Sequence, residues 1–224
     1  MEYPLLNKHF KSITSKDIDE HTAHWQGLIP STAEEIWSRI EFAGISPRVT
    51  YSVNVKAFKY LSFDRDLHYN SYSSMLKALK HCGTGIYKVK TKCLLDTYSK
   101  YVKDPRQFLK QQDETWQTYR NRITAEVYGL GYAKASFAVE LLYPLQAEVV
   151  CLDTHILKLF GIKNRSIQDK EDYQAFEHEF LLKCKELNIP PPIARNIIWN
   201  ELVANAEGLD FWTHCFRSYE ARSP

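Results

Sequence analysis

Apolar residues recur every three or four positions along most of this chain, which places them on one face of a helix. The first such segment follows Ser31 and Thr32, each of which has a Glu three residues later, the spacing of a capping box. We expect a helix to begin there and to stop at Gly44. The same pattern predicts further helices over residues 53–61, 71–81, 85–101, 113–127, 132–143, 153–160, 170–187 and 193–204.

One short apolar run, residues 148–152, is the only strand candidate, and it is too short and isolated to build a sheet. Residues 63–70 have the composition of a polar connection. A run of three prolines, 190–192, separates the last two expected helices because proline disfavours helix in the residue before it. The pattern therefore predicts an all-α fold.

The composition is that of an ordinary globular protein: 224 residues, of which 44% are apolar and 25% charged. That length suits one domain or two closely packed lobes. The five cysteines have neither zinc nor iron–sulfur spacing, and their odd number favours free thiols in a reducing compartment. No leader and no apolar run of membrane-spanning length is visible, so we expect a cytoplasmic protein without a membrane span.

Charge is distributed unevenly. The chain has a net charge of +2, yet residues 86–110 carry seven Lys or Arg side chains and two Asp. This segment includes Lys88, Lys90 and Lys92. A basic face on a near-neutral body is typical of nucleic-acid contact, although a solvated helix face would give the same count. Arg48, in a loop-like segment, is a further candidate for DNA contact, and an exposed loop arginine is its ordinary explanation.

Gly129-Leu130-Gly131 lies between two strongly helical segments and predicts a tight hairpin. Glycine permits a positive φ and a close approach of another backbone. A helix beginning near Tyr132 would present unpaired N–H groups and a positive dipole end, which suit a phosphate oxygen. Lys134 adds a cation in the first turn, where an anion nearby would explain it. The same sequence would also suit an ordinary turn between two helices that binds no ligand.

Asp153 ends the apolar run and precedes the next expected helix. Aspartate is a good helix N-cap, which is sufficient reason for its presence. A carboxylate beside a sugar can also stabilise charge that develops at C1′ when a glycosidic bond breaks, or orient the attacking nucleophile. A capped carboxylate is held rigid and ionised, so both roles can coexist.

Hairpin, helix and an apolar run that ends in Asp153-Thr154-His155 together resemble the helix-hairpin-helix (HhH-GPD) DNA glycosylases. The match is best over residues 119–160, within a core of about 71–160. Ala135-Ser136 resembles the archaeal 8-oxoguanine glycosylase branch. Residues 1–70 have only a faint likeness to phage proteins.

The resemblance implies one all-α, two-lobed domain over residues 1–224 that binds double-stranded DNA in its cleft as a monomer. It implies a flipped base, since chemistry on a stacked base requires extrusion. The cysteine spacing predicts no iron–sulfur cluster, and the resemblance implies a possible site for a monovalent cation, formed by the carbonyls of Ala125, Val127 and Leu130. The DNA-binding residues expected from the hairpin, the following helices and the basic segment are Gly129, Leu130, Gly131, Tyr132, Ala133, Ser136, His155, Lys88, Lys90, Lys92 and Arg48.

Two positions depart from the pattern of the resembled family. Tyr128 stands where relatives have proline. Bifunctional members have a nucleophilic Lys two residues after the second glycine, where this chain has Ala133 and the lysine follows as Lys134. One residue turns a helix by about 100°. Lys134 therefore either forms a Schiff base, giving AP-lyase activity, or binds phosphate. The resemblance implies that Asp153 is catalytic, because it falls on the catalytic Asp of the family.

Three functions remain open at this point. The first is a DNA N-glycosylase that excises a damaged or modified base. The second is a transferase that modifies thymine within phage DNA, and the third is a non-catalytic DNA-binding module, which has no need of Asp153. The aromatic residues that could stack on a base, each of which also suits the core, are Trp199, Trp212, Phe211, His214, Tyr87 and Trp116.

Overall fold

The computed structural model describes residues 3–163, 167, 169–203 and 208–216. The described residues form thirteen α-helices and one 3-10 helix, and no strand occurs among them. The prediction of an all-α fold is therefore confirmed. The chain divides into two compact units, residues 30–138 and residues 1–29 with 139–224. Each unit is described by itself.

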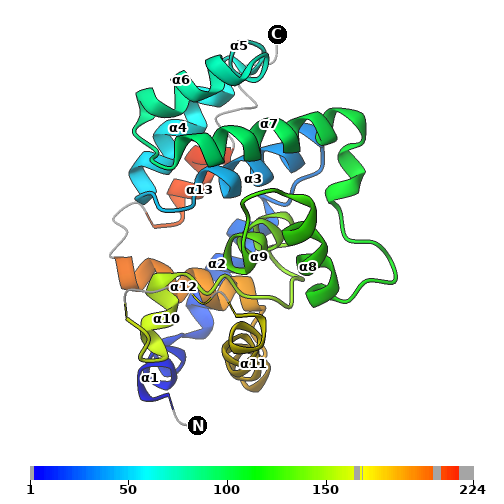
Figure 1. Ribbon diagram of the computed structural model, residues 1–224. Coiled ribbons are helices and arrows are strands. Elements are labelled where there is room, and N and C mark those ends of the chain that lie inside the picture. Colours follow the sequence, from blue (N-terminus) through cyan, green and yellow to red (C-terminus); the bar gives the residue numbers. More distant parts are fainter. Residues whose placement is uncertain (1–2, 164–166, 168, 204–207, 217–224) are drawn as a thin grey trace. The chain divides into compact units, whose positions relative to one another are not determined.

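The 30–138 unit is built around α3 (Ala33–Ile45), in which every residue from Ile36 to Ile45 is buried. Its predicted capping box exists and uses Thr32 and Glu35. Around α3 lie α4 (Tyr51–Phe63), α7 (Tyr87–Lys103) and the 3-10 helix η1 (Pro105–Phe108) (Figure 1). This packing gives the unit its apolar core.

Two further helices complete the first part of this unit. Residues 63–70 were expected to be a connection, but they contain a short helix, α5 (Arg65–Tyr69), so that prediction was wrong. Asp64 accepts the Leu67 N–H and caps it, a local signal that a polar composition conceals. α6 (Tyr72–Cys82) ends as predicted at Gly83, which has a φ of 75°.

The same unit ends with α8 (Trp116–Glu126) and the start of α9 (Tyr132–Leu142). The division between the two units falls within α9.

In the other unit, α12 (Pro191–Val203) is central and packs with α1 (Pro4–Ser12), α2 (Ser15–Gln26), α10 (Thr154–Leu159) and α11 (Lys170–Glu186). The last described helix is α13 (Asp210–Phe216), whose Trp212 ring lies 5.2 Å from that of Trp25. The hydrophobic pattern did not predict α1, α2 or α13. α1 and α13 are short, whereas α2 has 12 residues and begins with a capping box of Thr14 and Asp17 that was overlooked.

Candidate active site and DNA-binding hairpin

The predicted hairpin between helices α8 and α9 is present. The Leu130 N–H donates to the Val127 carbonyl at 3.2 Å and turns the chain back. The Gly131 carbonyl then accepts from the Lys134 and Ala135 N–H groups at 3.0 and 2.9 Å, so α9 begins immediately after the turn. The N-terminal end of α9, and with it the positive end of the helix dipole, therefore lies at the hairpin.

The two hairpin glycines are needed for different reasons. Gly129 has a φ of 83°, and a Cβ placed on it would lie 3.2 Å from Val89 Cγ1 on α7. The first glycine therefore permits both the turn and its close packing against α7. Gly131 has no atom within 4 Å of such a Cβ, and its φ lies outside the left-handed region. The protein's own fold gives no reason for this second glycine.

A buried arginine joins the two hairpin helices. Arg120 on α8 is fully buried and donates from Nη1 to Ser136 Oγ on α9 at 3.1 Å. Its guanidinium carbon also lies 5.2 Å from the centre of the Tyr132 ring. These contacts fix the first turn of α9. Ser136 is fully buried, so the prediction that it contacts DNA was wrong.

Lys90 also contradicts its prediction as a DNA contact. Its side chain is only 1% exposed, and Nζ donates to the Thr84 carbonyl at 2.6 Å. Burial, and next the charge of Lys134, lower the pKa of Lys90 to about 8. The helical pattern of α7 places this residue on the inner face, which the count of basic residues could not reveal.

The other expected cations are accessible. Lys88, Lys92 and Arg48 are exposed, and Lys92 Nζ lies 4.2 Å from the centre of the Tyr128 ring beside the hairpin. Lys134 is half-buried, with Nζ 5.4 Å from the Phe137 ring of its own helix. Lys134 forms no ion pair with any residue that the structure describes. Its charge is therefore available to an anion.

Of the remaining hairpin residues expected to contact DNA, Gly129 and Gly131 are exposed. Tyr132 and Ala133 are half-buried. The Leu130 side chain is buried and its N–H is used in the turn, which leaves only its carbonyl for a ligand.

Asp153 is the N-cap of α10. Its Oδ1 accepts from the His155 and Ile156 N–H groups at 2.9 and 3.0 Å. Oδ2 has no hydrogen-bond partner among the described residues, and the side chain is half-buried. One oxygen thus holds the carboxylate in a fixed orientation while the other remains available. The half-buried His155 has its ring 6.4 Å from that of Trp199.

The segment that leads to Asp153 is extended but is not part of a sheet. Side chains bind its N–H groups instead: Glu177 accepts from Val150 at 2.9 Å, Glu140 from Cys151 at 2.8 Å, and the Tyr173 hydroxyl from Leu152 at 3.2 Å. This satisfies buried amides that would otherwise lack partners. Glu140, Glu177 and Tyr173 therefore position the segment that carries Asp153.

Glu140 also forms a fully buried ion pair. Its Oε2 accepts from Arg195 Nε at 3.0 Å and lies 2.7 Å from Arg195 Nη2. Burial raises the pKa of Glu140 to about 7, and the charge of Arg195 opposes that rise. α9 thus carries Lys134 in its first turn and, six residues later, the carboxylate that holds Cys151.

The aromatic residues considered for base stacking differ in how far they are buried. Phe211 and Trp212 are 3% and 2% exposed and belong to the core, so they do not have the stacking role considered for them. Tyr87, Trp116 and Trp199 are half-buried, and His214 is exposed.

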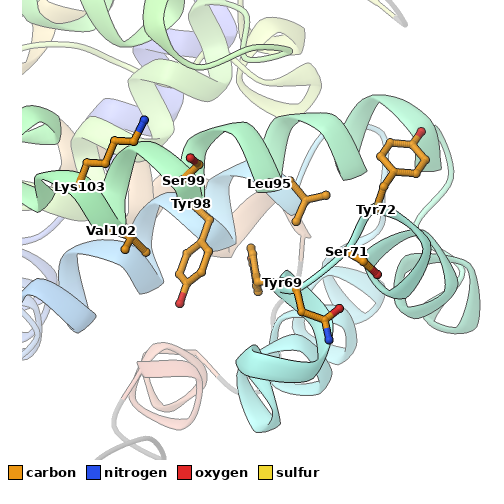
Figure 2. A pocket seen from close by; sticks show the side chains of 9 residues that line it. Tyr69, Ser71, Tyr72, Leu95, Tyr98, Ser99, Val102 and Lys103 are labelled. Atoms are coloured by element: carbon orange, nitrogen blue, oxygen red, sulfur yellow. The ribbon is translucent and has the colours of Figure 1, made fainter.

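An open hollow of about 500 Å³ lies between the α5–α6 junction and α7 (Figure 2). Tyr69, Tyr72 and Tyr98 line it, with Lys103 at one end. Its α7 residues follow helical spacing from Leu95 to Val102, on the side of α7 away from Val89 and the hairpin. This hollow is therefore separate from the hairpin site.

A scan against protein-family models matches residues 15–189 to the 8-oxoguanine DNA glycosylase (Ogg-HhH) model. This match covers well over half of the chain and includes both the hairpin and Asp153. The chain belongs to the 8-oxoguanine DNA glycosylase family. It is an enzyme of the helix-hairpin-helix superfamily, whose members excise damaged bases from DNA.

Solved structures show the same fold. The 8-oxoguanine DNA glycosylase of Thermotoga maritima is 13% identical with a TM-score of 0.72, over 89% of this chain and 97% of that one. That of Methanocaldococcus jannaschii is 18% identical with a TM-score of 0.71, over 90% and 94%. The M. jannaschii glycosylase/lyase in complex with a 15mer DNA containing 8-oxoguanine is 18% identical with the same TM-score, over 91% and 97%. Among curated proteins, none matches this chain.

The family match supports the glycosylase hypothesis over the other two, and neither phage origin nor thymine modification gains support from it. Within the described part of the chain, no helix is long and apolar enough to cross a membrane. No group of three His, Cys, Asp or Glu side chains in that part could hold a metal ion.

The glycosylase's supporting residues were not predicted from sequence. Arg120, Glu140, Glu177 and Arg195 are charged side chains in helices, which ordinarily face solvent. Their partners lie between 11 and 55 residues away along the chain. Only charged residues on otherwise apolar helix faces could have hinted at them.

Proposed function

We propose that this enzyme releases 8-oxoguanine from duplex DNA, with Asp153 as its catalytic carboxylate. The observation that carries the proposal is that only one of the two Asp153 oxygens accepts hydrogen bonds from the described residues. Oδ1 is bound by two backbone N–H groups, which hold the carboxylate in one orientation, and Oδ2 is left for a ligand. The complex with DNA containing 8-oxoguanine belongs to a relative with the same fold.

In the proposed reaction, the C1′–N9 bond breaks and its electron pair leaves with the base. The base nitrogen takes a proton, and water bonds to C1′ after losing one, so the products are a free base and an abasic site. Positive charge develops at C1′ before water has bonded, and a fixed carboxylate at that position stabilises it. Asp153 Oδ2 is the group proposed to do this.

The hairpin is proposed to hold a phosphate of the same DNA strand. The N-terminal end of α9, with the positive end of the helix dipole, favours an anion there. Lys134 supplies a full charge without a competing ion pair among the described residues. Gly131 leaves room for a phosphate to approach the backbone closely.

A monovalent cation is proposed at the start of the same turn. Ala125 lies in the last turn of α8, whose carbonyls have no partner within the helix. Val127 accepts one hydrogen bond and retains a second lone pair, and the Leu130 carbonyl follows two residues after Tyr128. Neutral carbonyl oxygens suit such a cation, whose charge would favour a phosphate nearby.

The test is a panel of duplexes that carry 8-oxoguanine, uracil, hydroxymethyluracil or an alkylated purine, with free base measured by mass spectrometry. We expect release of 8-oxoguanine, and a rate at least about a hundredfold lower for Asp153→Asn. Asparagine keeps the capping oxygen, so the fold is retained. Asp169→Asn is the matched control, because Asp169 Oδ1 caps α11 through the Glu171 and Asp172 N–H groups in the same way.

The proposal would be overturned if Asp153→Asn released the base at the wild-type rate, or if the wild type released no base from any duplex. Release of a different base would keep Asp153 and reject 8-oxoguanine. The mass of the products also separates excision from modification of a retained base.

AP-lyase activity through Lys134 is a second candidate. It is favoured by the position of this amine in the first turn of α9, near the charge of Lys90 and without a carboxylate partner among the described residues. Borohydride added during the reaction would trap a covalent adduct. An adduct that is absent in Lys134→Ala but present in Lys92→Ala supports this route, and the absence of any adduct in the wild type rejects it.

A further inference from the structure

A second basic surface lies on the 30–138 unit, apart from the hairpin. Residues 46–63 and 71–95 contain eight Lys or Arg side chains, all exposed except Lys90, and no Asp or Glu, while residues 64–70 between them add one Arg and two Asp. Outside residues 46–63 and 71–95, the chain carries 21 basic and 27 acidic side chains. Cations without interspersed acids are unusual on an ordinary solvated surface, where both signs alternate.

Four of these cations form one stripe. Lys56 and Lys59 are three residues apart on α4, and Lys77 and Lys80 are three apart on α6, so each pair shares one face of its helix. All four are exposed, and none forms an ion pair with another residue that the structure describes. These four lysines are called the α4–α6 stripe below.

The two halves of the stripe lie side by side. α4 packs against α6, as Figure 1 shows. The Tyr60 ring lies 4.9 Å from the His81 ring, and each of these residues follows a stripe lysine by one position. Lys56 is also close enough to Cys82 to influence its thiol. The contact between these rings therefore holds α4 and α6 next to each other.

The stripe continues toward the hairpin. α6 ends at Gly83, and α7 begins only four residues later with the exposed Lys88 and Lys92. Lys92 in turn contacts Tyr128 beside the hairpin. A path of exposed positive charge thus connects the stripe with the expected phosphate site within one unit.

We infer that the α4–α6 stripe binds the phosphate backbone of the duplex beyond the region held by the hairpin. This inference rests on the proposed action on duplex DNA. Neutralisation of phosphates by these lysines would release condensed counterions, which would drive the association. Phosphate contacts carry no sequence information, so the stripe adds affinity and footprint length without sequence preference.

The test uses the full chain with Lys56, Lys59, Lys77 and Lys80 all changed to Gln. The matched control changes four exposed lysines of the other unit, Lys8, Lys11, Lys170 and Lys185, to Gln. Both variants have the same net charge, so an effect of net charge alone is common to both. A third variant with Arg at the four stripe positions keeps the charge and should bind as the wild type does.

Binding is measured by fluorescence anisotropy on a long and a short duplex over a range of salt concentrations. We expect the stripe variant to bind the long duplex roughly tenfold more weakly at low salt. Its plot of log affinity against log salt should become shallower by roughly 0.9 for each phosphate that the variant no longer neutralises. The short duplex, which reaches only the hairpin, should distinguish the variants little.

Equal binding by the stripe and control variants, in a protein whose wild type binds and excises, would overturn the inference and leave the proposed function intact. If the wild type releases no base but its salt dependence still differs from that of the stripe variant, the proposed function is wrong and the inference that the stripe binds DNA stands. Competition by polyglutamate but not by duplex DNA would reject DNA as the partner. Circular dichroism on each variant confirms that the fold is retained.

Discussion

At the scale of single residues, the two hairpin glycines differ in whether the fold itself requires them. Gly129 is required by its own fold, because its backbone has a positive φ and a side chain would press on Val89. Gly131 has neither constraint. The sequence alone does not show which of the two glycines the fold requires, whereas the φ angle and the neighbouring atoms of each glycine do.

Alanine at each glycine tests this distinction. We expect Gly129→Ala to lower the free energy of unfolding by about 1–2 kcal/mol, since an L-residue is strained in the left-handed region. Gly131→Ala should leave stability nearly unchanged but weaken duplex binding, since a methyl group would obstruct a phosphate at the turn. Urea denaturation and anisotropy give the two readouts. If the Gly131→Ala variant binds duplex DNA normally, no phosphate approaches the backbone at Gly131 closely.

At the scale of elements, periodicity predicted the helices well where amphipathic patterns were long and ended by clear signals. α6 with Gly83 and α9 with Gly131 before it are examples. The five-residue α5 was missed because five residues hold too little of the 3.6-residue period.

The site was predicted only in part for a similar reason. Asp153 and the hairpin are local in sequence, so their motifs are visible. Lys90 and Ser136 were placed on the DNA side because nothing in their immediate sequence reveals which helix face is buried. Burial follows from the packing of distant elements, and Arg120, which binds the Ser136 hydroxyl, is 16 residues away.

The extended segment before Asp153 gives a prediction at this scale. Burial places the pKa of Glu140 at about 7 in the folded protein, above its ordinary 4.5. The folded state therefore holds the Glu140 proton more tightly than the unfolded chain does. This contribution to stability is present below about pH 4.5 and is lost as the pH rises through 7.

Comparison of the wild type with Glu140→Gln isolates this effect. The free energy of unfolding of the wild type, relative to the variant, should fall between pH 4.5 and 7 and then level off. Glu171→Gln, an exposed position on α11, is the control and should follow the wild type. A difference between wild type and Glu140→Gln that is constant across this range would show that Glu140 titrates below it.

At the scale of the whole molecule, a near-neutral chain conceals two oppositely charged units. The 30–138 unit contains 17 basic and 10 acidic residues, a net +7, whereas the rest contains 12 basic and 17 acidic residues, a net −5. The overall +2 therefore says little about affinity for DNA. The hairpin, the basic start of α7 and the α4–α6 stripe all belong to the positive unit.

This partition predicts how salt should affect the reaction. Phosphate-binding groups hold substrate and transition state alike, so their weakening should raise KM and lower kcat/KM, steeply on a log–log plot against salt. In the proposed reaction, Asp153 acts on charge that develops only in the transition state, and its Oδ1 bonds are internal to the protein. The rate at saturating enzyme should therefore change little with salt. Single-turnover base release at several enzyme and salt concentrations separates the two quantities. A saturated rate that fell as steeply as kcat/KM would mean that the basic unit acts in the chemical step as well as in binding.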